Sequence, residues 1–262
     1  MPKLELNTLI QGDGPPVVLV HGLAASLHNW DAQIPALAQA GYRVYAMDLP
    51  GHGDSPMPEE PEYYHADTFC QALEDWFEAQ SFHQPVALVG HSLGGYLSLC
   101  YTLRHLPFVR KLALIDPFYR PRQMQAPLRR ALRLRPNVGV RILSLARETW
   151  IDRLLEAMPE NLAGFPPEPR HQIAVDYKRA SPLVMRIPAT FRDLTDHLPA
   201  LDLPACVIWG ADDITLHPLS FSALARNLPN AEGHSLPRTA HQPHVSRAAQ
   251  VNELLLAFLR QS

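Results

Sequence analysis

Short apolar runs alternate with amphipathic segments along most of this chain of 262 residues, and this alternation constrains the fold more than any other feature. Near-continuous apolar runs predict strands at 17–20, 44–47, 86–89, 112–115 and 205–209. Helical periodicity falls between and after them, at 30–40, 66–80, 92–106, 219–227 and 245–259. Strands that lack polar alternation belong in a parallel sheet covered on both faces. The pattern therefore predicts an α/β fold with a doubly wound, mostly parallel sheet flanked by helices.

Two segments depart from this alternation. Residues 4–10, followed by the turn-forming residues 12–15, predict an antiparallel edge strand. From 118 to 203 no clear strand pattern is found, and frequent prolines divide the segment into several short helices. We therefore predict a helical cap, or lid, inserted between two sheet strands. The core would comprise residues 1–117 and 204–262, and the cap residues 118–203.

Composition and charge describe an ordinary globular protein. Charged residues make up 19% of the chain and the formal net charge is −3, which gives no reason to expect nucleic acid as a partner. The start lacks the apolar segment of a signal peptide, and no apolar run is long enough for a transmembrane helix. The cysteines, Cys70, Cys100 and Cys206, are widely spaced within apolar patterns and predict buried free thiols. We expect a cytoplasmic protein without integral membrane association.

The predicted cap differs in charge from the rest of the chain. It holds 14 lysines and arginines against 9 aspartates and glutamates, whereas the remainder is acidic. The arginines gather near its start, at Arg120, Arg122, Arg129, Arg130, Arg133, Arg135, Arg141 and Arg147. A solvated helical face is the simpler interpretation of this Arg-rich segment. The alternative is a site for an anionic partner or substrate, such as an acyl carrier protein or a lipid head group.

The segment Gly90-His91-Ser92-Leu93-Gly94 carries the strongest functional signal. It lies between a predicted strand and a predicted helix, so Ser92 falls on a sharp turn that raises its hydroxyl above the sheet edge. The flanking glycines allow a strained backbone and a close approach of helix to strand. A serine hydroxyl needs an adjacent base to become a nucleophile. The context predicts a nucleophilic serine, and a helix-capping serine is the simpler alternative.

Several further motifs occur in one order along the chain. They are His21-Gly22, Asp48-Leu49-Pro50-Gly51-His52-Gly53-Asp54-Ser55, the segment around Ser92, Trp209-Gly210-Ala211-Asp212-Asp213, and Ala240-His241. With these motifs the chain resembles the α/β-hydrolase fold superfamily, in its cap-bearing branch of serine esterases, lipases and C–C hydrolases. The resemblance spans nearly the whole chain outside the predicted cap. It is specific for the superfamily and says little about the substrate, because function depends on the site.

The resemblance implies a catalytic triad of Ser92, His241 and Asp213. His241 would be the base, because it follows the last strand-like segment and precedes the final helix. His244 is its main rival, with His234 and His217 more remote. Asp213 would orient the imidazole and stabilise its protonated form. Asp212 is the runner-up, and Asp116 is a second alternative, because some members place the acid after the earlier strand.

The same resemblance implies an oxyanion hole formed by the backbone amides of Leu23 and Leu93. His21 and the segment 48–55 are interpreted as structural. No histidine or cysteine cluster has metal-ligand spacing, and no phosphate-binding or dinucleotide-binding motif is found, so we expect no metal and no cofactor.

The leading functional hypothesis is a carboxylesterase-like serine hydrolase that cleaves small to medium esters through an acyl-enzyme on Ser92. Serine at this position argues against dehalogenases and epoxide hydrolases of this fold, which use an aspartate there. The same triad would also serve a C–C bond hydrolase, an acyltransferase or a perhydrolase. A non-catalytic binding member of the fold is the remaining alternative. A panel of p-nitrophenyl esters, run beside Ser92→Ala, would separate an esterase from a binding protein.

Overall fold

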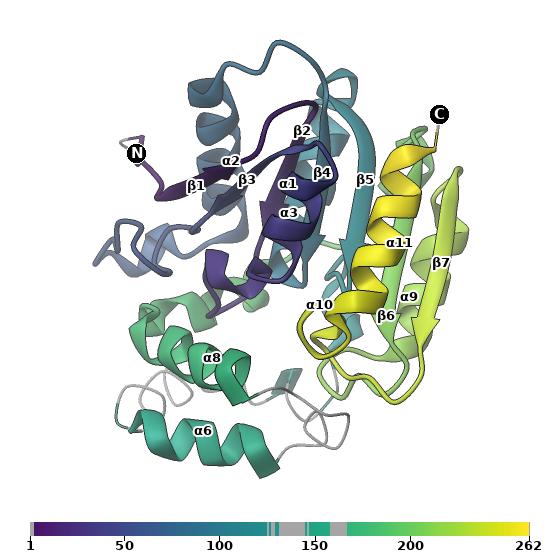
Figure 1. Ribbon diagram of the computed structural model, residues 1–262. Coiled ribbons are helices and arrows are strands. Elements are labelled where there is room, and N and C mark those ends of the chain that lie inside the picture. Colours follow the sequence, from purple (N-terminus) through teal and green to yellow (C-terminus); the bar gives the residue numbers. More distant parts are fainter. Residues whose placement is uncertain are drawn as a thin grey trace.

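A seven-stranded sheet forms the centre of the molecule, with helices on both faces (Figure 1). The computed structural model describes residues 3–124, 147–157 and 167–261, together with residues 126, 129, 130 and 145. The strands are β1 Thr8–Gln11, β2 Pro16–Val20, β3 Arg43–Met47, β4 Val86–His91, β5 Val109–Ile115, β6 Ala205–Gly210 and β7 Ala231–Leu236. Their order is β1-β3-β2-β4-β5-β6-β7. Strand β1 pairs antiparallel with β3, and all other pairs are parallel, as predicted.

The helices that cover the sheet lie close to their predicted positions. They are α1 Gln33–Gln39, α2 Ala66–Gln80, α3 Leu93–Arg104, α9 Pro218–Asn227, α10 Pro243–Ser246 and α11 Ala248–Arg260. The predicted helix at 30–40 is wrong at its start, because Leu27–Trp30 forms a separate 3-10 turn, η1. The predicted helix at 245–259 is likewise divided into α10 and α11.

Alternate residues of the central strands enter two separate cores. Along β2, Val17 and Leu19 pack with α1 and α11, whereas Val18 and Val20 pack with α2, α3 and α9. Successive side chains of a strand point to opposite faces, so a strand between two helical layers must be apolar at every position. All five residues of β2 are accordingly buried. This confirms the two-sided burial that the apolar runs predict.

The strand that sequence reasoning missed is β7. Its sequence, Ala-Glu-Gly-His-Ser-Leu, is neither continuously apolar nor regularly alternating, and most of its residues are partly or fully exposed. An edge strand has one neighbour and needs less apolar surface than a central strand. The strand predicted at 4–10 is also shorter and shifted, because residues 8–11 pair with β3 and residues 4–7 do not.

A helical insertion separates β5 from β6. Its described elements are η4 Pro121–Gln123, α6 Glu148–Ala157, α8 Pro167–Arg179, η5 Pro182–Thr190 and η6 Thr195–Ala200. In Figure 1, α6 and α8 lie beyond the edge toward which the arrows of β5 and β7 point. The carboxyl ends of the parallel strands therefore face the insertion. The boundaries 118 and 203 of a separate cap domain stay a prediction.

The remaining turns and the cysteines complete the described chain. Two further 3-10 turns are η2 Pro61–Tyr63 and η3 Leu106–Phe108. Cys70, Cys100 and Cys206 are buried free thiols, as predicted. In the part of the chain described here, the helices are too short or too polar to cross a bilayer. The cytoplasmic location stays a prediction.

Candidate active site

The turn between β4 and α3 places Ser92 at the carboxyl edge of the sheet. Strand β4 ends at His91 and α3 begins at Leu93, which leaves Ser92 at a φ of 51°. A positive φ is strained for a residue with a side chain, and it persists only where the surroundings hold it. Here the Ser92 amide donates to the carbonyl of Ile115 at 3.0 Å. Its own carbonyl accepts from the amides of Tyr96 and Phe118, both at 3.1 Å.

The glycines on either side of Ser92 are required by packing. A Cβ atom at Gly90 would overlap the Gly94 carbonyl and the hydroxyl of Ser98. A Cβ atom at Gly94 would overlap the carbonyl oxygens of Val20 and His21, at the end of the neighbouring strand β2. Helix α3 therefore starts in direct contact with the strand beside it. This contact fixes the height and direction of the Ser92 side chain.

Two hydrogen bonds connect Ser92, His241 and Asp213. The Ser92 Oγ lies 2.9 Å from the Nε2 of His241. On the other side of the ring, Nδ1 of His241 donates to Oδ2 of Asp213 at 2.7 Å. The second oxygen of Asp213 accepts from the amides of Thr215 at 2.7 Å and Leu216 at 3.0 Å. The Asp213 side chain is completely buried, and hydrogen bonds to both of its oxygens fix its position.

The rival residues lie elsewhere or play other parts. His244 is buried against Trp30, and its Nε2 donates to the Asn29 side chain at 2.9 Å. Burial lowers the pKa of His244 to about 3, and the nearby His241 contributes to this shift. Asp212 and His217 are exposed, and His234 faces Glu232 on the edge strand β7.

Asp116 lies beside the triad. A carboxylate oxygen of Asp116, a carboxylate oxygen of Asp213 and a ring nitrogen of His241 all lie within 4.8 Å of one another. One Asp116 oxygen accepts from the amide of Gly210 at 3.0 Å. Asp116 is thus a second buried carboxylate near His241, but the bond that Nδ1 of the imidazole makes at 2.7 Å goes to Asp213.

The two residues whose amides are expected to form an oxyanion hole follow neighbouring strands. Leu23 follows β2 and Leu93 opens α3, directly after β4, and these two strands are neighbours in the sheet. Within the described residues, neither amide donates to a protein acceptor. A Cβ atom at Gly22 would overlap the ring of His91 and touch the side chain of Ser92, so the 21–23 turn packs directly on the Ser92 turn.

Buried neutral histidines support these loops. His21 Nδ1 donates to the Gly22 carbonyl at 2.7 Å, and its Nε2 accepts from the Leu49 amide at 3.0 Å. His91 Nε2 donates to the carbonyl of His241 at 2.8 Å. Burial lowers the pKa of His21 and, more strongly, that of His91, which keeps both rings uncharged. Their hydrogen bonds fit the structural role predicted for His21 and assign one to His91.

A cavity of about 320 Å³ opens above Ser92. Its apolar lining includes Leu23, Phe118, Met124, Ile173, Met185 and Pro188, and its polar lining includes Asn29, Asp176, Tyr177, Thr215 and Gln242. Apart from Leu23, sequence reasoning missed these residues, because many belong to the helical insertion and no motif marks them. The spacing of Ile173, Asp176 and Tyr177 on one helical face is the signal that could have grouped three of them.

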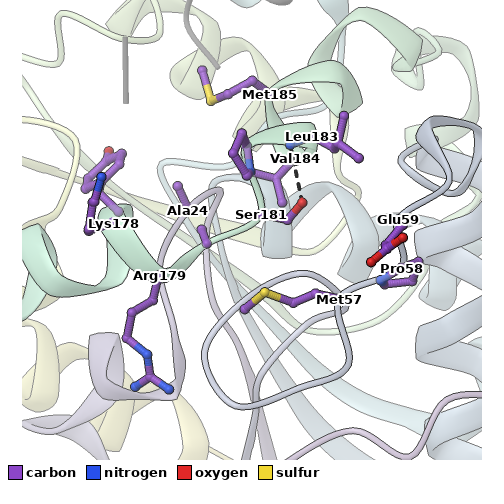
Figure 2. A pocket seen from close by; sticks show the side chains of 13 residues that line it. Ala24, Met57, Pro58, Glu59, Lys178, Arg179, Ser181, Leu183, Val184 and Met185 are labelled. Carbon is purple, nitrogen blue, oxygen red and sulfur yellow. Dashed lines mark hydrogen bonds between the residues drawn. The ribbon is translucent and has the colours of Figure 1, made fainter. Parts of the chain in front are cut away.

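A larger open pocket of about 630 Å³ adjoins this cavity and shares Ala24, Tyr177 and Met185 with its lining. Figure 2 shows Met57, Pro58 and Glu59 of the core opposite the segment from Lys178 to Met185. This segment joins α8 to η5. Its backbone is tied to the core where the amide of Ser181 donates to the Gly51 carbonyl at 2.8 Å.

Among the described residues, two groups bring together side chains of metal-ligating type. One is the Asp116, Asp213 and His241 group, in which a hydrogen bond joins His241 to Asp213. The other comprises Cys206, Glu232 and His234. Burial and the neighbouring Glu232 carboxylate raise the pKa of the Cys206 thiol, which opposes the thiolate form that binds metals. The expected absence of a metal stays a prediction.

The Arg-rich segment is described only in part. Arg133, Arg135 and Arg141 lie outside the described residues. Arg129 donates to the carbonyl of Met124 at 3.2 Å, and the Arg120 guanidinium lies 5.0 Å from the centre of the Tyr119 ring. An anionic partner at this segment stays a prediction.

Residues 15–248 match the sequence family described as alpha/beta hydrolase fold. The chain therefore belongs to the alpha/beta hydrolase fold family. The match begins just before β2 and ends at the start of α11, so it includes Ser92, Asp213 and His241.

Individual relatives differ in how much of their length is matched. "Bifunctional epoxide hydrolase 2" of Rattus norvegicus is 36% identical over 128 residues, 48% of this chain and 23% of the relative. The chain thus spans about a quarter of the length of that relative. "Putative carbamate hydrolase RutD" of Variovorax paradoxus (strain S110) is 29% identical over 94% of this chain and 92% of its own length. A thermophilic esterase from Thermogutta terrifontis superposes with a TM-score of 0.81, at 26% identity, over 98% of this chain and 93% of the esterase.

Proposed function

We propose that this protein is a carboxylesterase-like serine hydrolase, which cleaves esters of small to medium acyl groups through an acyl-enzyme on Ser92. The observation that carries the proposal is the pair of hydrogen bonds from Ser92 to His241 and from His241 to Asp213. A hydroxyl within 2.9 Å of an imidazole nitrogen can transfer its proton to that nitrogen as the oxygen attacks. The resemblance to a thermophilic esterase supports the same reaction class.

The first half of the proposed reaction forms the acyl-enzyme. Ser92 Oγ attacks the ester carbonyl carbon while its proton passes to Nε2 of His241. The negative charge that develops on the carbonyl oxygen is stabilised by the amides of Leu23 and Leu93. Collapse of the tetrahedral intermediate breaks the carbon–oxygen bond of the ester, and the protonated His241 gives its proton to the leaving alcohol.

Water completes the reaction by the reverse proton path. His241 takes a proton from a water molecule, whose oxygen attacks the acyl carbon. The bond to Ser92 Oγ then breaks, the proton returns to Ser92, and the carboxylic acid leaves. Asp213 holds the imidazole with Nδ1 protonated and stabilises the imidazolium in both halves. Its complete burial and three hydrogen bonds suit it to this orienting role.

The test is hydrolysis of p-nitrophenyl esters of increasing acyl length by the wild type and by Ser92→Ala. We expect turnover by the wild type and a loss of at least about 10³-fold in kcat for the variant. A fluorophosphonate probe should label the wild type and leave Ser92→Ala unlabelled. If the wild type is as inert as the variant toward every ester and toward the probe, the proposed function is wrong.

A further inference from the structure

Asp176 places a buried carboxylate in the wall of the cavity above Ser92. It lies on α8, on the helical face that also presents Ile173 and Tyr177 to the cavity. The residue is only 3% exposed. Ser92, His241 and Asp176 line the same cavity of about 320 Å³, so a substrate attacked at Ser92 can reach this carboxylate. The proposed ester hydrolysis at Ser92 does not use this carboxylate.

Asp176 is the acceptor in both of its hydrogen bonds. Ser26 Oγ donates to one carboxylate oxygen at 2.9 Å, and Gln172 Nε2 donates to the other at 2.9 Å. The same Ser26 oxygen accepts from the amide of His28 at 3.2 Å, which leaves its proton for the bond to Asp176. Both partners are neutral and favour the ionised form of Asp176, with lone pairs left over on each oxygen.

Asp176 makes no ion pair within the described chain, and the more distant imidazole of His28 offsets only part of the effect of burial on its pKa. Lysine, arginine and histidine nitrogens there make their ion pairs with other carboxylates, and none lies within 4.0 Å of Asp176. A buried carboxylate without a counter-ion is costly, and a cationic donor arriving in the cavity would relieve that cost. Burial accordingly raises the pKa of Asp176 to about 6, although the bonds from Gln172 and Ser26 oppose the shift.

We propose that Asp176 is the polar end of the substrate pocket and selects esters that carry a protonated amine on the part of the molecule bound beneath α8. This inference rests on the proposed ester hydrolysis at Ser92. The ammonium group would donate to the remaining lone pairs of Asp176, while the chain that joins it to the ester contacts the apolar side chains of the cavity. A hydroxyl in the same place would gain one neutral donor bond and a smaller advantage.

Three p-nitrophenyl esters with equal numbers of heavy atoms test the proposal: heptanoate, 6-hydroxyhexanoate and 6-aminohexanoate. At pH 8 we expect the wild type to prefer the amine ester, and Asp176→Asn to lower the ratio of kcat/KM for amine over heptanoate at least about tenfold. The change should appear mainly in KM, because the group binds substrate and does not react. The hydroxyl ester should fall between the other two. An unchanged ratio, or a preference for the hydroxyl ester, would overturn the proposal.

Two matched variants separate binding of the amine from a purely structural role of Asp176. Ser26→Ala removes the hydrogen bond between α8 and the core but keeps the carboxylate, so it should leave the amine preference within about threefold of the wild type. Glu168→Gln removes an exposed charge from the same helix and should do the same. If Ser26→Ala abolishes the preference as fully as Asp176→Asn, the carboxylate acts as a structural tie and the proposal is wrong.

The pH dependence of the preference gives an independent readout. The amine ester stays protonated between pH 5 and pH 8. As the pH falls through about 6, Asp176 gains a proton and the amine preference of the wild type should disappear, whereas Asp176→Asn should show a flat ratio. Other titratable groups near Asp176 on the packed elements are His28, Asp31, Asp48, Glu168, His241 and His244. The preference is a ratio of kcat/KM for two esters. An effect of these groups on turnover through His241 changes both values alike and therefore cancels in the ratio.

Binding without turnover keeps the two proposals distinguishable. Wild-type hydrolysis of the heptanoate ester, lost in Ser92→Ala, reports the proposed function alone. Calorimetric titration of Ser92→Ala with 6-aminohexanamide and heptanamide reports the Asp176 site alone. We expect the amine to bind at least about tenfold more tightly at pH 8 and this difference to vanish in the double variant Ser92→Ala, Asp176→Asn. Equal affinities in Ser92→Ala would overturn the assignment of Asp176 whatever the esterase assay shows.

Discussion

The two walls of the cavity above Ser92 are built on different principles. The core wall consists of residues at the carboxyl ends of parallel strands, where a strained backbone, close-packed glycines and buried hydrogen bonds fix each position. The opposite wall consists of α8 and η5. Polar contacts join it to the core, such as Ser26 to Asp176 and the Ser181 amide to Gly51, and Val184 and Ile187 of η5 also pack into the hydrophobic core. The residues of the proposed chemistry thus belong to the core wall, and α8 and η5 supply surface that would contact the rest of a substrate.

We therefore expect substitutions in the core wall to lower activity far more than substitutions in the opposite wall. The largest loss should come from a change at Asp213. We expect Asp213→Asn to lower kcat for a p-nitrophenyl ester about 10⁴-fold, because the amide no longer holds the imidazole in the required tautomer. Asp116→Asn is the matched control, and it should lose no more than about tenfold. A greater loss for Asp116→Asn than for Asp213→Asn would assign the orienting role to Asp116.

A second prediction concerns folding at the Ser92 turn. Gly94→Ala should lower the free energy of unfolding by about 3 kcal/mol or more, because the added Cβ overlaps the carbonyls at the end of β2. Chemical denaturation followed by circular dichroism measures this change. Gly41→Ala is a useful comparison, because Gly41 has a positive φ but no atoms near its Cβ position. A loss at Gly41 as large as that at Gly94 would show that contact with β2 is not what makes Gly94 sensitive.

Much of the core wall could be predicted from sequence. The apolar run before Ser92 and the glycines around it are local signals, so the turn itself was predictable from neighbouring residues. Asp213 and His241 are far from Ser92 in the chain and were selected through resemblance, because no local rule says which of 13 histidines faces a given serine. Strand β7 was missed because its half-exposed position removes the apolar pattern.

The wall formed by α8 could not be predicted in the same way. An aspartate within a polar helix looks like any solvated residue, and the burial of Asp176 depends on where α8 docks relative to Ser26. Docking of that kind arises from contacts between segments 150 residues apart in the chain. Helical periodicity indicates which residues share a face, but it does not say what that face meets.

A third prediction concerns the contribution of Asp176 to the stability of the protein. Its pKa in the folded state, about 6, is raised above the ordinary value of 3.8, mainly by burial, so the folded protein holds this proton more tightly than the unfolded chain. The contribution of Asp176 to stability is therefore lost as the pH rises from about 4 through 6. Asp176→Asn should be more stable than the wild type at pH 8, by up to about 3 kcal/mol, with the advantage shrinking toward pH 4. Denaturation curves at pH 4, 6 and 8 measure it, and an advantage that grows toward pH 4 would contradict it.

The smallest expected effect comes from the exposed tie between α8 and the core. Arg179 pairs with Asp54, and both side chains are substantially exposed to solvent. Such pairs contribute between about 0 and 1 kcal/mol. Arg179→Ala should therefore shift the free energy of unfolding by less than about 1 kcal/mol and leave kcat for a short ester within about threefold. A large loss of activity in Arg179→Ala would contradict this difference between the two walls, because it would show that the wall formed by α8 and η5 controls the reaction.

The pairing of β5 with β6 has a consequence for how such a molecule could diversify. The helical insertion leaves the sheet at the carboxyl end of β5 and the chain returns at the amino end of β6, which is parallel to β5, so both attachment points belong to adjacent strands of one sheet. When both ends of a segment are anchored on one sheet, doubling its length adds only about 0.6 kcal/mol of closure entropy. Descendants of one ancestor could thus lengthen, shorten or exchange this segment while inheriting the strand ends unchanged. New substrate ranges would then evolve by replacement of a single continuous stretch of the gene.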